Sequence, residues 1–177
     1  DAMSKGVQFL MKKNKIEVIA GNAKVKPGRK VEVTAADGKA TVYEAKHIMI
    51  ATGARSRELP NLKQDGKKVI GYREAMVLPQ QPKSMVVVGS GAIGVEFAYF
   101  YHSIGTKVTV VEYLPQIVPL EDEDVSKQLA RSFKKSGIEI MTESSVEKVD
   151  TSGNGCKVTV KTKNGETSLE CDIVLSA

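Results

Sequence analysis

The sequence is poor in the features that mark several common classes of protein. Aromatic residues make up only 5% of its 177 residues, and the 26 basic residues are dispersed among 21 acidic ones despite a net charge of +5. Nucleic acids are recognised by clustered basic and stacking side chains, so nucleic-acid binding is not expected. No apolar run approaches the roughly 18 residues that a membrane-spanning helix needs, and no signal-peptide core opens the chain. We therefore expect a soluble, cytoplasmic protein with no membrane partner.

Cysteine is scarce as well. Cys156 and Cys171 are the only two, and they fall in two expected strands. Their spacing fits neither a close redox pair nor a zinc site, so we expect two reduced thiols that behave as small hydrophobes. The acidic run 121–124 is expected to complement the dipole at the start of a helix. No metal site is predicted.

The strongest motif lies in residues 84–112. Residues 85–88 form a short, unbroken apolar run, which is typical of a strand buried on both faces of a parallel sheet. Gly89, Gly91 and Gly94 follow at once and form the pattern G-x-G-x-x-G. A glycine turn directly after a buried strand is the context that a dinucleotide-binding motif requires.

The segment after the glycines predicts a helix that ends at Gly105. A second Val-rich strand, 107–111, ends on Glu112. Strand, turn, helix, strand and acid thus occur in the order of a nucleotide-binding unit. The helix is expected to present an apolar face formed by Ile93, Phe97, Phe100 and Ile104.

Each part of the motif has a physical role. Gly89 permits the tight turn, Gly91 has no Cβ to keep a diphosphate from the backbone, and Gly94 lets the helix pack close to the sheet. The helix N-terminus favours the diphosphate, and the Glu112 carboxylate suits two ribose hydroxyls. A 2′-phosphate would be repelled by Glu112, and residues 112–124 contain no Lys or Arg. The motif therefore favours NAD over NADP.

The two halves of the chain repeat one order of elements. Segment 12–19 (KKNKIEVI) is similar to KKSGIEIM further on, and 30–38 (KVEVTAADG) is similar to KVTVKTKNG. In the first half we expect a helix end, a strand at 16–20, a hairpin around Asp37-Gly38 and a buried strand at 48–51. The duplication predicts two nucleotide-binding units and hence two dinucleotides.

Two stretches together resemble a known family. VVVGSGAIGVEFA (86–98) and IMIATGARSRELP (48–60) resemble the flavin-dependent pyridine nucleotide-disulfide oxidoreductases, and within them the dihydrolipoamide dehydrogenase branch. The resemblance implies an α/β fold with a Rossmann-like parallel sheet and a three-stranded β-meander, plus a partial FAD-domain remnant made of a helix end and a β-meander. It implies an FAD-domain remnant at 1–55, a connector at 56–83 and an NAD-binding domain, truncated at its last strand, at 84–177.

The resemblance also implies which residues bind the cofactors. Ile93 takes the place of a tyrosine gate found in glutathione reductases, Glu96 lies near the nicotinamide, and Val146 contacts the adenine side through its backbone. The residues implied for NAD are Gly89, Ser90, Gly91, Ala92, Ile93, Gly94, Val95, Glu96, Glu112 and Val146. Those implied for FAD are Gly21, Thr52, Gly53 and Ala54, although an ordinary turn explains Gly21 equally well.

In such an enzyme, dihydrolipoamide on the lipoyl domains of 2-oxo acid dehydrogenase complexes passes electrons through a disulfide and FAD to NAD. The complete protein would be a homodimer. The chain contains no CxxxxC disulfide, no FAD glycine loop and no His-Glu base pair, so no catalytic residue is assigned in it and it is expected to be inactive alone. Another flavin-disulfide reductase or NADH oxidase remains an alternative, as does a non-catalytic NAD-binding or redox-sensing module.

Overall fold

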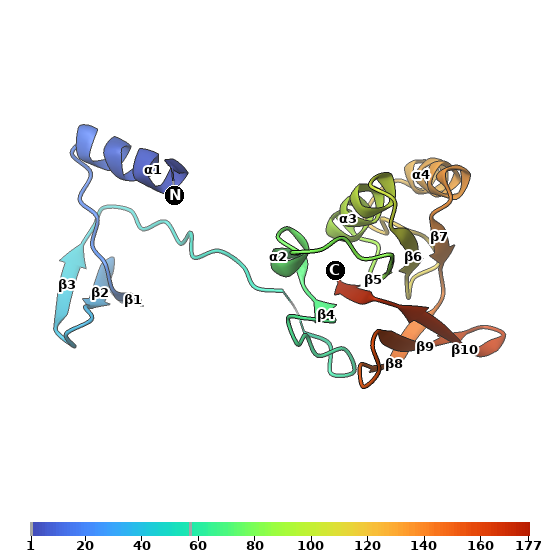
Figure 1. Ribbon diagram of the computed structural model, residues 1–177. Helices are drawn as coiled ribbons and strands as arrows, with labels where there is room; N and C mark the ends of the chain where they lie inside the picture. The colour runs from blue at the N-terminus through green and yellow to red at the C-terminus, as the bar shows by residue number, and fades with distance from the viewer. Residues whose placement is uncertain (1, 57) are drawn as a thin grey trace. The chain divides into compact units, whose positions relative to one another are not determined.

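The computed structural model describes residues 2–56 and 58–177 (Figure 1). Asp1 and Arg57 lie outside the described residues, Arg57 within the expected connector 56–83. The chain divides into two compact units, one ending at Gly53 and the other beginning at Ala54. We describe each unit by itself.

The first unit contains one helix and one antiparallel sheet of three strands in the order β1-β2-β3. The expected hairpin is confirmed, because β2 and β3 pair around a turn in which the Lys39 N–H donates to Asp37 Oδ1 (3.0 Å) and Gly38 has φ +83°. The elements are α1 (Ala2–Lys13), β1 (Asn22–Lys26), β2 (Lys30–Thr34) and β3 (Ala40–Glu44).

Two strands expected in this unit do not form. Residues 16–20 and 48–51 have no regular structure, and the first strand is instead β1, which pairs with β2 from Asn22 to Lys26. An apolar run becomes a buried strand only where a neighbouring strand completes its hydrogen bonds. Among the described residues of this unit neither run has such a neighbour, and Ile16 and Ile50 remain exposed.

The second unit is built on a parallel five-stranded sheet in the order β4-β11-β5-β6-β7, which confirms the Rossmann-like α/β fold. The connector segment 56–83 contributes β4 and α2 to this unit. The strands are β4 (Val69–Ile70), β5 (Ser84–Val88), β6 (Lys107–Val111), β7 (Glu139–Met141) and β11 (Ile173–Ser176). The helices are α2 (Tyr72–Ala75), α3 (Ala92–Ser103) and α4 (Glu123–Ser136).

A three-stranded antiparallel meander follows β7, as expected, in the order β10-β9-β8. Its strands are β8 (Ser145–Asp150), β9 (Cys156–Thr162) and β10 (Gly165–Cys171). Side chains alternate along β5, so Met85 and Val87 pack with the helices while Val86 packs with Val158 and Val160 of the meander. The unbroken apolar run of β5 therefore serves two separate cores, one on each face of the sheet.

Helix α3 is confirmed, and small residues form much of the face by which it lies on the sheet. Its buried residues are Gly94, Ala98 and Tyr101, whereas Ile93 and Phe100 are about half exposed, at 46% and 53%. Gly94 and Ala98 have little or no side chain, so the helix backbone can come close to β5. Of the four apolar residues that indicated the helix, Phe97 packs partly against this core.

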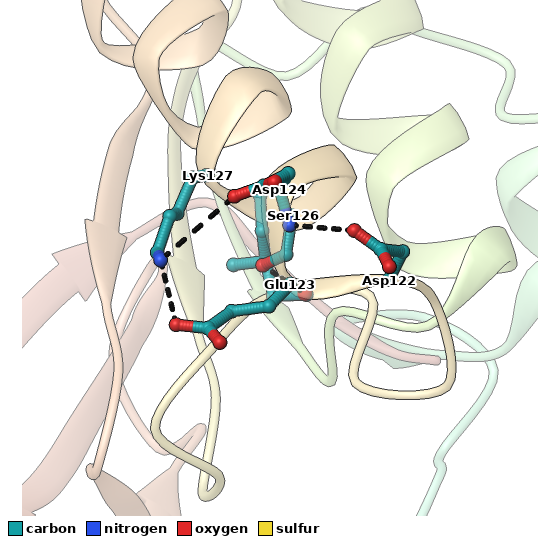
Figure 2. Close-up of polar contacts among 6 residues, drawn as sticks. Asp122, Glu123, Asp124, Ser126 and Lys127 are labelled. Atoms are coloured by element: carbon teal, nitrogen blue, oxygen red, sulfur yellow. Dashed lines mark hydrogen bonds and ion pairs between the residues drawn. The ribbon is translucent and has the colours of Figure 1, made fainter.

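Helix α4 begins as the acidic run predicts (Figure 2). The Asp122 side chain accepts a hydrogen bond from the Asp124 N–H (2.9 Å), which makes Asp122 the N-cap. Lys127 Nζ lies 2.6 Å from Glu123 and 4.0 Å from Asp124, one turn along the exposed face. Among the described residues no helix is long and apolar enough to cross a bilayer.

Candidate functional site

The candidate site is the glycine loop between β5 and α3, and its three glycines differ in their surroundings. Gly89 has φ +99°, and a Cβ there would lie 2.5 Å from the Ala177 carbonyl oxygen. A Cβ on Gly94 would lie 2.1 Å from the Gly89 carbonyl oxygen. A Cβ on Gly91 would meet no atom within 4 Å. Gly89 and Gly94 are therefore demanded by the fold itself, whereas the space at Gly91 is open to a ligand.

The loop leads directly into the N-terminus of α3. Gly91 is the N-cap residue, and it provides no side-chain hydrogen bond to the first turn. Uncapped N–H groups and the positive end of the helix dipole favour an anion, and this is the arrangement that holds diphosphates in dinucleotide-binding folds. The open space at Gly91 lies at this end of the helix.

Glu112, directly after β6, is linked to the glycine loop through its carboxylate. Oε2 accepts hydrogen bonds from the Ser90 N–H (2.8 Å) and the Ser90 hydroxyl (2.5 Å), and Oε1 accepts one from the Leu114 N–H (2.8 Å). Glu112 is 7% exposed and Ser90 is fully buried. A carboxylate has about four acceptor positions, so Glu112 can still accept one hydrogen bond, at Oε1, from a ligand hydroxyl.

The loops beyond β6 and β7 support this arrangement. The Val118 N–H donates to the Ser90 carbonyl (2.9 Å), and Val118 has φ +42°, which is rare for a β-branched residue. The Ser144 N–H donates to the Glu112 carbonyl (2.9 Å). Both ends of the Ser90-Glu112 contact are therefore fixed by backbone hydrogen bonds from neighbouring loops.

The other residues expected along α3 differ in their surroundings. Val95 packs partly against the core beneath the helix, whereas Ala92, Ile93 and Glu96 are exposed. The last three are therefore accessible to a ligand, while Val95 can contribute little beyond its backbone.

Val146 lies in β8 and faces the core between the sheet and the meander, where it is 7% exposed. Its carbonyl accepts a hydrogen bond from the Asn61 side-chain amide. The structure therefore engages the backbone carbonyl of Val146 within the protein. Val146 is also paired with Val160 of β9 in the meander.

The four residues expected to approach FAD fall in different settings. A Cβ on Gly21 would lie 2.6 Å from the Thr34 carbonyl oxygen, so packing against β2 is by itself enough to require glycine there. Thr52 and Gly53 are exposed at the end of the first unit, and Gly53 has φ +79°. Ala54 belongs to the second unit.

Ala54 and Ile93 line one cavity of about 360 Å³ in the second unit. Tyr72 and Ala177 also line it. The structure thus brings one residue expected at the flavin and one expected at the nicotinamide to the same hollow. Sequence reasoning missed Tyr72, because nothing in its local pattern distinguishes it from an ordinary residue of a short helix.

Known proteins resemble this chain along nearly its whole length. The model of the pyridine nucleotide-disulphide oxidoreductase family matches residues 1–177. The dihydrolipoyl dehydrogenase of Zymomonas mobilis is 42% identical over 95% of the chain, which spans only 36% of that relative. Among solved structures, LpdA of Mycobacterium tuberculosis has a TM-score of 0.85 at 30% identity, with 99% of this chain and 39% of LpdA covered.

A second solved structure is the HOCl-induced flavoprotein disulfide reductase RclA of Escherichia coli. It has a TM-score of 0.72 at 26% identity, with 98% of this chain and 40% of RclA covered. The family description names a pyridine nucleotide and the RclA title names a flavoprotein, which are the two cofactor classes expected from the sequence. The resemblance seen in the two sequence motifs is confirmed: this chain belongs to the pyridine nucleotide-disulphide oxidoreductase family.

Proposed function

We propose that the chain is the NAD(H)-binding portion of a flavin-dependent dihydrolipoamide dehydrogenase. The observation that carries the proposal is the open space at Gly91, at the uncapped N-terminus of α3. Gly89 and Gly94 have internal reasons to be glycine, but Gly91 has none, and a bound diphosphate supplies one. The similarity to dihydrolipoyl dehydrogenase supports the choice of enzyme.

Each expected NAD residue then has a task. The backbone N–H groups at the start of α3, from Gly91 to Gly94, hold the diphosphate, and Glu112 accepts a hydrogen bond from the ribose at its remaining acceptor position. Ser90 orients the Glu112 carboxylate for that purpose. On the nicotinamide side are Ile93 and Glu96, which are exposed, and Val146 approaches the adenine side.

NAD is favoured over NADP by the charges around Glu112. Residues 113–124 contain no Lys or Arg that could bind a 2′-phosphate. Lys163 reaches this region through its ion pair with Glu143 (2.5 Å), whose N–H donates to the Leu114 carbonyl (3.0 Å). Because Lys163 is already paired with Glu143, Lys163 is a poor partner for the 2′-phosphate of NADP.

In the proposed whole protein, Thr52, Gly53 and Ala54 approach FAD, with Gly21 as the weaker candidate. Dihydrolipoamide on lipoyl domains of 2-oxo acid dehydrogenase complexes reduces a disulfide, and the electrons reach NAD through FAD. The whole protein is a cytoplasmic homodimer. The 177-residue chain has no activity by itself.

The closest alternative is another flavin-disulfide reductase. The similarity to RclA, a flavoprotein disulfide reductase, supports this alternative. NADH oxidases share the same motifs. A CxxxxC motif in the sequence upstream of Asp1 would favour the leading proposal, and its absence would contradict it. A non-catalytic NAD-binding or redox-sensing module is the rival from a different class, and it predicts nucleotide binding with no electron transfer in the whole protein.

Calorimetric titration of the chain with NADH, NADPH and FAD tests the proposal. We expect NADH to bind more tightly than NADPH, FAD to bind little, and Glu112→Ala to abolish most NADH binding. Tighter binding of NADPH would contradict the cofactor assignment. Circular dichroism of the variant separates loss of the ribose contact from loss of the fold, since Glu112 also holds Ser90.

A further inference from the structure

The two cysteines, far apart in the sequence, are direct neighbours in the meander. Cys156 opens β9, Cys171 closes β10, and the two residues are paired in register. Residues directly opposite one another in antiparallel strands have Cα atoms about 4.5 or 5.5 Å apart. Disulfides span Cα distances of about 4.4 to 6.8 Å, so either spacing suits a covalent bond.

The side chains of the pair lie on the same side of the meander. Both cysteines are buried and free, and they belong to the same core between the meander and the sheet. Cys156 Sγ donates weakly to the carbonyls of Lys68 and Asp172, both at 3.7 Å. The register therefore places two reduced cysteines opposite one another on adjacent strands, with no other cysteine in the chain to compete.

A hollow of about 540 Å³ lies beside the pair and is lined by both cysteines. Ser152 and Asp172 are among its other lining residues, so the entrance is polar. Strand β10 lies at the edge of the meander, where local opening costs least. A small polar reagent therefore has a route to the sulfur atoms.

The two thiols differ in their electrostatic surroundings. Burial raises the pKa of Cys156, but the nearby Lys68 ammonium partly offsets that rise. Lys68 Nζ is held close by the carbonyls of Thr151 (2.7 Å) and Gly155 (3.5 Å). Burial, together with the neighbouring Cys156, raises the pKa of Cys171 to about 12. Cys156 is therefore the more readily ionised of the two.

We propose that Cys156 and Cys171 form a dithiol-disulfide redox site whose oxidant is a small-molecule disulfide. The Cys156 thiolate attacks one sulfur of the reagent, forming a mixed disulfide and releasing one thiolate. The Cys171 thiolate then attacks the sulfur of Cys156 and releases the second. Two protein thiols are oxidised to one disulfide, the small disulfide is reduced to two thiols, and both protons remain with those products.

The bond would form at the junction between the meander and the parallel sheet. Asp172 follows Cys171 directly, and its carboxylate accepts hydrogen bonds from the N–H groups of Lys83 (2.7 Å) and Ser84 (3.0 Å) at the start of β5. The site is thus separate from the glycine loop at the other end of β5. It does not depend on the proposed nucleotide chemistry.

Oxidised glutathione, added to the 177-residue chain at mildly alkaline pH, tests the proposal. After acid quenching, free thiols are counted in denaturant and intact masses are measured. We expect the wild-type chain to lose both thiols, to lose two hydrogen atoms in mass, and to stay monomeric without retained glutathione. Proteolysis should then yield a peptide pair linked through Cys156 and Cys171.

Two single variants provide the matched controls. Cys171→Ala should stop at a glutathione adduct on Cys156, and Cys156→Ala should react at least several-fold more slowly. Two retained thiols, two glutathione adducts or a cross-link between chains in the wild type would overturn the proposal. Faster modification of Cys156→Ala would overturn the order of attack.

Discussion

Ser90 binds the Glu112 carboxylate twice, through its backbone N–H at 2.8 Å and its hydroxyl at 2.5 Å. The two residues are buried and join the glycine loop to the end of β6. We predict that Ser90→Ala, which removes only the hydroxyl bond, lowers the free energy of unfolding by about 1.5–3 kcal/mol, as expected for a bond to a charged group. Urea unfolding followed by circular dichroism measures this change.

Ser103→Ala is the matched control for that prediction. Its hydroxyl donates to the Tyr99 carbonyl (2.7 Å) in an exposed turn of α3. The control should change the free energy of unfolding by less than about 0.5 kcal/mol. Equal effects of the two variants would show that the buried Ser90 contact has no special importance.

Gly94→Ala should destabilise the second unit. The added Cβ would lie 2.1 Å from the Gly89 carbonyl oxygen, which is backbone and cannot rotate away. Overpacking of this kind costs about 1–3 kcal/mol or more, and it outweighs the usual gain of about 1 kcal/mol from Ala in a helix. Thermal unfolding measures this change. The control is Gly6→Ala in α1, where a Cβ meets nothing within 4 Å, and this variant should be neutral or stabilising. A stable Gly94→Ala variant would contradict the close packing of α3.

Figure 2 allows two kinds of contact at the start of α4 to be compared. Asp122→Ala removes the N-cap bond to Asp124, and should lower the free energy of unfolding by about 1 kcal/mol. Lys127→Ala removes the ion pairs with Glu123 and Asp124, which are exposed, and should cost at most about 0.5 kcal/mol. Denaturant unfolding of both variants measures the difference. The reverse order would mean that the ion pairs, and not the cap, determine where the helix begins.

Asp65 should make stability depend on acid pH. Burial raises the pKa of its carboxyl, but the hydrogen bonds from the N–H groups of Lys67, Lys68 and Val69 together outweigh burial and lower the pKa below 3.8. A lowered folded-state pKa adds stability that is present above the unfolded-state pKa and is lost as pH falls through the folded-state pKa.

Asp65→Asn keeps the Oδ1 acceptor that serves all three N–H groups but removes the charge. The stability difference between wild type and variant should therefore be largest above about pH 5 and shrink towards about pH 2. Thermal unfolding across this range measures it. If the two proteins lost stability in parallel, the Asp65 carboxylate would not contribute.

The glycine motif and the parallel sheet could be predicted because their signals are local. An apolar run followed by G-x-G-x-x-G specifies a buried strand and a tight turn whatever surrounds it, and β5, α3 and β6 appear where expected. The hairpin at Asp37-Gly38 is equally local. The family was indicated by the glycine motif together with the segment 48–60.

The remaining features depend on contacts between distant residues. The packing face of α3 follows from how close Gly94 lies to Gly89, which the apolar periodicity of the helix did not reveal. The runs at 16–20 and 48–51 have the composition of strands, but a strand also needs a partner. The pairing of Cys156 with Cys171 depends on the register of a hairpin, which their spacing in the sequence did not reveal.

The most direct test of the nucleotide site is the affinity of Gly91→Ala for NADH. A Cβ at Gly91 touches nothing in the protein, so the variant should unfold at the wild-type temperature. It would occupy the space proposed for the diphosphate and should raise the Kd for NADH by about tenfold or more. Gly153→Ala is the matched control, since its Cβ also meets nothing within 4 Å, and it should bind NADH like the wild type. Unchanged NADH affinity in Gly91→Ala would contradict the assignment of the glycine loop as the pyridine nucleotide site.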